Sequence, residues 1–227
     1  MPEPLVTKPL LVFDLDGTIV DSAGDLITSL NLVMAEEGLP AIPHAAVSAI
    51  VGAGARAMIE RGLRYLGEDP ALRDIDDLMA RFIVHYSRVM PADSRPYPGL
   101  GATFDRFEAA GWRFAVCTNK PEALSYQLLD ALDISPRLSA ICGGDTFAVR
   151  KPDARHLFGT IEKAGGDPAD TIMVGDSRSD IEVARNAGIP VVAVTFGYAD
   201  RPVGEFGPDA VIDHLDELWD AVAGLKR

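Results

Sequence analysis

The chain has 227 residues, of which 48% are hydrophobic and 24% charged, so its composition is that of a folded protein with a substantial core. It carries 21 lysines and arginines against 34 aspartates and glutamates, and its net charge is -13. This charge opposes long-range attraction to nucleic acids and anionic membranes, so neither is expected as a partner. A small anionic substrate can still bind where local donors and a metal ion reverse the field.

The start of the chain, MPEPLVTKPLLVF, has three prolines and polar interruptions before a short apolar run. This pattern is typical of neither a signal peptide nor a membrane helix, so a cytoplasmic location is expected. Cys117 and Cys142 match no CxxC or zinc-ligand spacing and lie in apolar surroundings. We predict two reduced thiols in the core.

Short, continuously apolar runs recur along the chain, at residues 10–14, 113–118, 140–144, 171–176 and 191–195. Continuous apolarity indicates strands that are covered on both faces. Helical patterns lie between or around these runs, at about 98–110, 121–132, 153–165 and 178–187. The order predicts an α/β fold with a Rossmann-like, doubly wound parallel sheet, whose ligands bind at the carboxyl ends of the strands.

The interval from residue 22 to residue 92 contains amphipathic helical patterns and no convincing strand. We therefore expect a helical cap subdomain over 22–92, inserted after the first strand, and a catalytic core made of 1–21 and 93–227. The returning segment MPADSRPYPGLG is rich in proline and glycine, which favours a hinge.

Polar residues follow the first, second and fourth predicted strands, at the edge where a ligand would bind. The acidic ones are Asp14, Asp16, Asp176 and Asp180. Converging carboxylates repel one another unless a hard cation neutralises them, and ligation by oxygen alone suits Mg2+. Taken singly, Asp176 and Asp180 also suit the start of a helix, as an N-cap and a first-turn acid. Taken together, the residues indicate a magnesium site beside a phosphoryl group.

In this interpretation Asp14 is a nucleophile that forms an aspartyl-phosphate, and Asp16 is the acid and base that protonates the leaving oxygen and then activates water. Gly17 lets the backbone turn tightly beside the phosphate.

The remaining polar residues at this edge suit the binding of phosphoryl oxygens. Thr118 and Asn119 could hold these oxygens, and Lys151 could balance the charge of nucleophile and phosphate. Each also has a structural alternative, as a strand-to-helix cap or a solvated surface charge.

Four motifs occur in order along nearly the whole chain: DLDGT at 14–18, CTN at 117–119, Lys151-Pro152 and GDSRSD at 175–180. In these the sequence resembles the haloacid dehalogenase superfamily of aspartate-dependent phosphohydrolases. The resemblance implies a helical cap and Mg2+ held by Asp14, the carbonyl oxygen of Asp16 and Asp176, with Asp180 supporting the metal site or Lys151.

Particular residues narrow the choice within that superfamily. Dehalogenases lack an acid/base at the position of Asp16, so phosphoryl transfer is preferred. Phosphonoacetaldehyde hydrolases and β-phosphoglucomutases use a cap lysine, whereas residues 22–92 contain none. The mutases also carry a histidine where this chain has Leu26.

The stretches DSAGDL at 21–26, VGAGARAMIERGL at 51–63, CTNKP at 117–121 and FGY at 196–198 resemble the phosphoglycolate phosphatase group. Gly52 and Gly54 would let a cap loop approach the substrate, with Arg56 available for a carboxylate. Arg56 is equally compatible with an exposed loop position, and Lys120 with either the substrate or solvent.

The expectation is thus a Mg2+-dependent phosphatase for a small phosphorylated metabolite, 2-phosphoglycolate foremost, acting as a monomer or homodimer. The alternatives are a related phosphatase for pyrophosphate, a nucleoside monophosphate or a sugar phosphate, and a phosphate-binding module without turnover.

Overall fold

The protein is described by a computed structural model, which covers residues 8–51 and 54–225. At its centre is a six-stranded sheet in the order β5-β4-β1-β6-β7-β8, with every neighbouring pair parallel. The strands are β1 (Leu10–Phe13), β4 (Arg113–Cys117), β5 (Leu138–Cys142), β6 (Thr171–Gly175), β7 (Val191–Val194) and β8 (Ala210–Ile212). The first five overlap the predicted apolar runs, although β5 begins and ends two residues before the predicted run 140–144, and β8 adds an edge strand that was not predicted.

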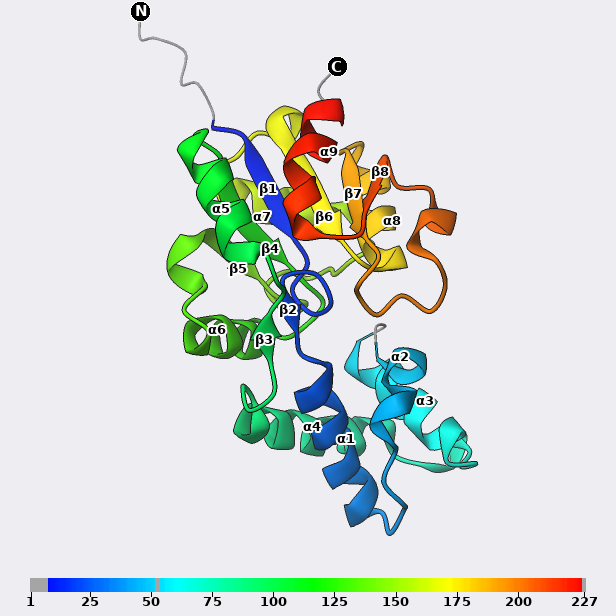
Figure 1. The fold of residues 1–227 in the computed structure, drawn as a ribbon. Coiled ribbons are helices and arrows are strands. Elements are labelled where there is room, and N and C mark those ends of the chain that lie inside the picture. The colour runs from blue at the N-terminus through cyan, green and yellow to red at the C-terminus, as the bar shows by residue number, and fades with distance from the viewer. Residues whose placement is uncertain (1–7, 52–53, 226–227) are drawn as a thin grey trace, which may run out of the picture.

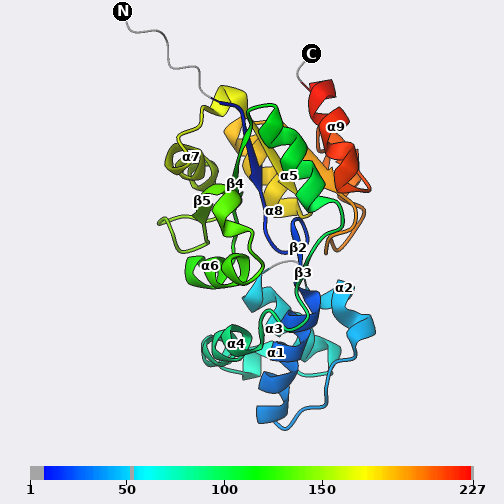
Figure 2. The same ribbon diagram turned by 60° about the vertical axis from the view of Figure 1, so that its left-hand side comes forward.

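Helices cover both faces of this sheet (Figures 1 and 2). They are α5 (Leu100–Ala109), α6 (Glu122–Ala131), α7 (Ala154–Lys163), α8 (Arg178–Ala187) and α9 (Leu218–Leu225). Successive residues of β1 serve opposite faces, since Leu10 and Val12 pack in one cluster with α7 and α8, and Leu11 and Phe13 pack in another with α5, α6 and α9. Burial on both faces explains why β1 is apolar at every position.

Four further helices form a separate layer beyond the carboxyl ends of the strands, at the bottom of Figure 1. They are α1 (Ala23–Glu36), α2 (Val47–Ile50), α3 (Ala55–Tyr65) and α4 (Ile75–Val89), and we call them the cap. On α4 the buried residues are Leu78, Phe82 and Tyr86, four positions apart, so that one stripe of the helix faces inward. The predicted α/β fold with an inserted helical cap is confirmed.

The chain passes between core and cap at two adjacent points. Strand β2 (Val20–Asp21) on the way out pairs antiparallel with β3 (Arg95–Pro96) on the way back. Asp25, fully buried in the first turn of α1, accepts hydrogen bonds from the backbone N–H groups of Asp93 and Ser94 at 2.9 and 3.0 Å. The segment predicted as a hinge is therefore fastened to the outgoing strand at its core end.

Cys117 and Cys142 lie opposite each other on β4 and β5, and both are buried, free thiols, as predicted. Among the helices of the described residues, none combines the length and apolarity needed to cross a membrane.

Candidate active site

Three carboxylates meet at the carboxyl edge of the central strands. Asp14 follows β1, Asp176 follows β6, and Asp180 lies in the first turn of α8. Each offers an oxygen that lies within 4.8 Å of the others, and all three residues are largely or fully buried. Neighbouring parallel strands β1 and β6 thus bring together residues more than a hundred and sixty positions apart, as the motif order predicts.

Lys151 is the cation of this cluster, and its side chain is only 1% exposed. Its Nζ lies 2.9 Å from Asp14 Oδ1 and 2.6 Å from Asp180 Oδ1. The other oxygen of Asp180 accepts from the Ser177 N–H and hydroxyl at 2.9 and 2.6 Å. Burial alone would lower the pKa of Lys151, but the two carboxylates outweigh it and raise this pKa. Asp180 therefore orients Lys151 toward Asp14.

Burial acts in the opposite direction on the acids. It raises the pKa of Asp14 to about 6, with the charge of Asp180 adding to the effect and Lys151 opposing it. Burial, followed by the charges of Asp180 and Asp14, raises the pKa of Asp176 well above its ordinary value. One ammonium group thus faces three buried carboxylates. The excess of negative charge, carried by oxygen ligands, fits a hard divalent cation such as Mg2+.

Asp176 is held by the loops around it. The Thr18 hydroxyl donates to its Oδ1 at 3.1 Å, and the Tyr198 N–H donates to its Oδ2 at 2.7 Å. Gly17 has a φ of +82°, and a Cβ there would stand 2.5 Å from Asp176 Oδ2. Only glycine allows this close approach. Thr18 and Tyr198 were not among the predicted site residues, although both lie in stretches, DLDGT and FGY, on which the family resemblance depends.

Asp16 lies beside this cluster with its side chain 22% exposed. It accepts from the Ser22 hydroxyl at 2.6 Å and from Lys120 Nζ at 3.0 and 3.1 Å. Lys120 also donates to the hydroxyl of Tyr86 on α4, at 2.6 Å. A cap residue is thereby linked to the core through one buried lysine. Neither Ser22 nor Tyr86 was predicted, and no sequence pattern marks Tyr86 beyond its place on the buried face of α4.

The end of β4 supplies Thr118 and Asn119. The Thr118 N–H donates to the Cys142 carbonyl at 3.0 Å, extending the sheet by one residue. The Asn119 amide donates to the Lys151 carbonyl at 3.1 Å, so β4 and the loop that carries Lys151 are tied together.

A cleft of about 790 Å³ separates the sheet edge from the cap. Most of the predicted site residues line it: Asp14, Asp16, Gly54, Arg56, Thr118, Asn119, Lys120, Lys151 and Asp176. Gly17 and Asp180 lie behind this lining, against Asp176 and Lys151. Gly52 lies outside the described residues.

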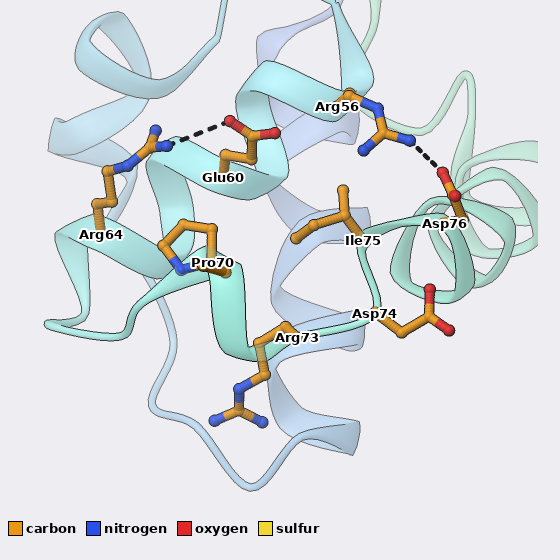
Figure 3. Close-up of a pocket in the computed structure, with 9 residues that line it drawn as sticks. Arg56, Glu60, Arg64, Pro70, Arg73, Asp74, Ile75 and Asp76 are labelled. Atoms are coloured by element: carbon orange, nitrogen blue, oxygen red, sulfur yellow. Dashed lines mark hydrogen bonds and ion pairs between the residues drawn. The ribbon is translucent and has the colours of Figure 1, made fainter.

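Arg56 lies where the cleft meets the cap surface. Its helix α3 begins directly after Gly54, which has a φ of +83°. The Arg56 side chain is 49% exposed and forms an ion pair with Asp76 on α4, as Figure 3 shows, beside a second hollow of about 490 Å³ on the cap. Arg64, Arg73, Glu60 and Asp74 surround that hollow, so its charges are mixed.

His156 supports the lysine loop from within the core. The Lys151 N–H donates to its Nδ1 at 3.1 Å, so its Nε2 carries the proton and donates to the Gly143 carbonyl at 3.0 Å. Burial and the charge of Lys151 lower the pKa of His156 to about 4. The imidazole is therefore neutral near pH 7.

The sequence profile of the haloacid dehalogenase-like hydrolases matches residues 11–194. This chain belongs to that family. It is 51% identical over 215 residues to the phosphoglycolate phosphatase of Agrobacterium fabrum, covering 95% of this chain and 92% of that relative. It is 43% identical over 202 residues to that of Caulobacter vibrioides, covering 89% and 85%.

A crystal structure shows the same architecture. It is that of a predicted phosphoglycolate phosphatase from Haemophilus somnus, which superposes with a TM-score of 0.85 at 28% identity and covers 96% of this chain and 100% of its own. The fold of family members thus extends over both core and cap, and the resemblance found in the motifs is confirmed.

Proposed function

We propose that this family member is a Mg2+-dependent phosphatase that hydrolyses 2-phosphoglycolate through an aspartyl-phosphate on Asp14. The observation that carries the proposal is Lys151, buried between Asp14 and Asp180 beside Asp176, with Asp16 facing the same cleft. A buried carboxylate paired with a lysine at a ligand-binding edge suits a covalent nucleophile. The names of the relatives support phosphoglycolate as the substrate.

The carboxylates of Asp14 and Asp176 and the carbonyl oxygen of Asp16 would hold Mg2+, with Asp180 behind them. Bound there, the ion would neutralise the excess carboxylate charge and stabilise the charge on the phosphoryl oxygens.

In the first step a carboxylate oxygen of Asp14 attacks phosphorus, and the bond from phosphorus to the ester oxygen breaks. Asp16 donates its proton to that oxygen, so glycolate leaves as an alcohol. Asp16 then accepts a proton from water, which attacks the phosphorus of the aspartyl-phosphate. Phosphate departs and Asp14 regains its carboxylate.

Three side chains would hold the phosphoryl group during both steps. The Thr118 hydroxyl and the Asn119 amide lie at the end of β4, and the Lys151 ammonium contacts the nucleophile directly at 2.9 Å. Fixed donors of this kind stabilise developing charge without reorganising. Closure of the cap over the cleft would exclude bulk water and leave only the water molecule that the second step consumes.

The test is phosphate release at near-neutral pH from 2-phosphoglycolate, pyrophosphate, a nucleoside monophosphate and several sugar phosphates, with and without Mg2+. We expect a Mg2+-dependent kcat/KM for 2-phosphoglycolate that exceeds the others by roughly a hundredfold, which is about 2.7 kcal/mol of discrimination. Comparable kcat/KM values for several of these compounds would contradict 2-phosphoglycolate as the substrate. If none of them released phosphate, the proposed phosphatase activity toward these compounds would be contradicted.

A further inference from the structure

Tyr86 is a cap residue that is linked to the proposed acid/base Asp16 through Lys120. It lies on α4, is 1% exposed, and lines the cleft. Its hydroxyl accepts a hydrogen bond of 2.6 Å from Lys120, whose Nζ also contacts both oxygens of Asp16. The side chain of Lys120 is 5% exposed, so cation and hydroxyl are both withdrawn from solvent next to Asp16.

The hydroxyl of Tyr86 is also a potential hydrogen-bond donor. In the part of the chain that the structure describes, this group accepts from Lys120 and donates to no side chain or carbonyl. Burial raises the pKa of Tyr86 to about 12, so the proton stays in place near neutral pH. Buried donors normally find an acceptor, and one that borders a cleft is suited to a ligand atom.

We propose that Tyr86 and Lys120 form the subsite for the carboxylate of the substrate, so that the cap helix α4 sets the specificity of the reaction. This inference rests on the proposed function. Asp16 must lie within hydrogen-bond reach of the leaving oxygen, roughly 2.6–3.2 Å. In 2-phosphoglycolate a single methylene separates that oxygen from the carboxylate. The substrate carboxylate must therefore lie close to Asp16, next to Lys120 and Tyr86.

This assignment replaces the expectation that Arg56 binds the carboxylate. Arg56 is half exposed and already paired with Asp76. Among the other arginines of the cleft, Arg61 lies 3.7 Å from Asp200, and Arg150 and Arg178 are exposed. Lys120 is the buried cation that contacts the proposed acid/base, and a charge withdrawn from water discriminates more strongly between partners than an exposed one.

The experiment compares 2-phosphoglycolate with ethyl phosphate, in which a methyl group replaces the carboxylate. Tyr86→Phe removes only the hydroxyl, because the ring keeps its stacking on Phe82 and its contact with the Lys120 ammonium. Tyr65→Phe makes the same change at a 51% exposed position on α3 and serves as the matched control. The measured quantity is the ratio of the two kcat/KM values.

We expect Tyr86→Phe to lower this ratio about tenfold, mainly through 2-phosphoglycolate, as for the loss of a hydrogen bond to a charged group. The ratio for Tyr65→Phe should equal that of the wild type. If the wild type prefers 2-phosphoglycolate but Tyr86→Phe lowers kcat/KM equally for both esters, the subsite would be overturned and the proposed substrate would stand. A wild type without preference for 2-phosphoglycolate would overturn the proposed substrate together with the subsite.

Discussion

The charges at the sheet edge and those on the outer cap form similar ion pairs in different surroundings. Lys151 is 1% exposed, and its partners Asp14 and Asp180 are 12% and 0% exposed. Arg56 on the cap is 49% exposed, and its partner Asp76 is 84% exposed. Withdrawing charges from water is costly, whereas an exposed pair contributes about 0–1 kcal/mol to stability. From this difference we expect the buried group to be needed for activity and the exposed pair to be replaceable.

Both regions place three carboxylates around one cation, and they differ in how far water reaches those charges. Three carboxylates share one lysine at the sheet edge, whereas Arg81 on α4 binds Glu36, Glu37 and Asp77 where solvent screens their repulsion. Changes at the sheet edge should therefore affect activity, metal binding and pH dependence, and changes on the cap surface should affect none of them strongly.

The largest effect is expected from Asp14→Asn. An amide in place of the proposed nucleophile should lower kcat by about ten-thousandfold or more, as for the removal of a covalent nucleophile. Phosphate release from 2-phosphoglycolate measures it, with Asp76→Asn as the control that makes the same change on the cap. Turnover of Asp14→Asn near the wild-type rate would remove Asp14 from the mechanism.

A smaller effect concerns the metal. Mg2+ at a hundred times its dissociation constant should stabilise the wild type by about 2.7 kcal/mol. In Asp176→Asn the gain should fall below about 0.5 kcal/mol, because a ligand and its charge are lost. Without Mg2+ this variant should be at least as stable as the wild type, since Asp14 and Asp180 repel Asp176. Denaturant unfolding with and without Mg2+ measures both, and an undiminished gain in Asp176→Asn would contradict the site.

The third effect is a loss of stability in acid. Folding lowers the pKa of His156 to about 4, so between the unfolded value of about 6.5 and pH 4 the unfolded chain binds the proton more readily, and acid favours unfolding. From pH 7 to pH 5 this group should cost about 2 kcal/mol. His156→Gln should lose less free energy of unfolding than the wild type over this range, by about that amount. Equal losses in both proteins would show that His156 titrates normally.

The smallest effect is expected on the cap surface. Asp76→Asn removes the partner of Arg56 and should change the free energy of unfolding by less than about 0.5 kcal/mol, as for an exposed pair. Denaturant unfolding at low and at high salt measures it. A loss of about 3 kcal/mol or more, as expected when a buried ion pair is broken, would contradict the difference between the two regions.

Much of the fold could be predicted, because strands buried on both faces are apolar at every position and helices flank them. Strand β8 could not be predicted, because Ala210–Ile212 is only three residues long and Val211 is 46% exposed. So short and exposed a segment shows neither the continuous apolarity of a buried strand nor a clear alternation. The pairing of β2 with β3 could not be predicted for a related reason, because strands of two residues are too short to show a periodic pattern in the sequence.

The site was predictable where its residues follow strands, as Asp14, Thr118 and Asp176 do, because parallel strands bring their carboxyl ends to one edge. Tyr86 and Asp25 follow no such rule. Each meets its partner across the junction of core and cap, Tyr86 through Lys120 and Asp25 through Ser94, and such contacts depend on how two packed layers meet. A single sequence carries no local signal for them.

The central claim is that the buried carboxylate of Asp14 becomes phosphorylated during turnover. The most direct measurement is rapid acid quenching of the Mg2+-loaded enzyme mixed with 2-phosphoglycolate, followed by proteolysis and mass spectrometry of the peptide that contains Asp14. We expect one added phosphoryl group on Asp14 within the first turnover, absent from Asp14→Asn. Phosphate release at the full rate with no phosphorylated peptide, or with the group on another residue, would contradict the account.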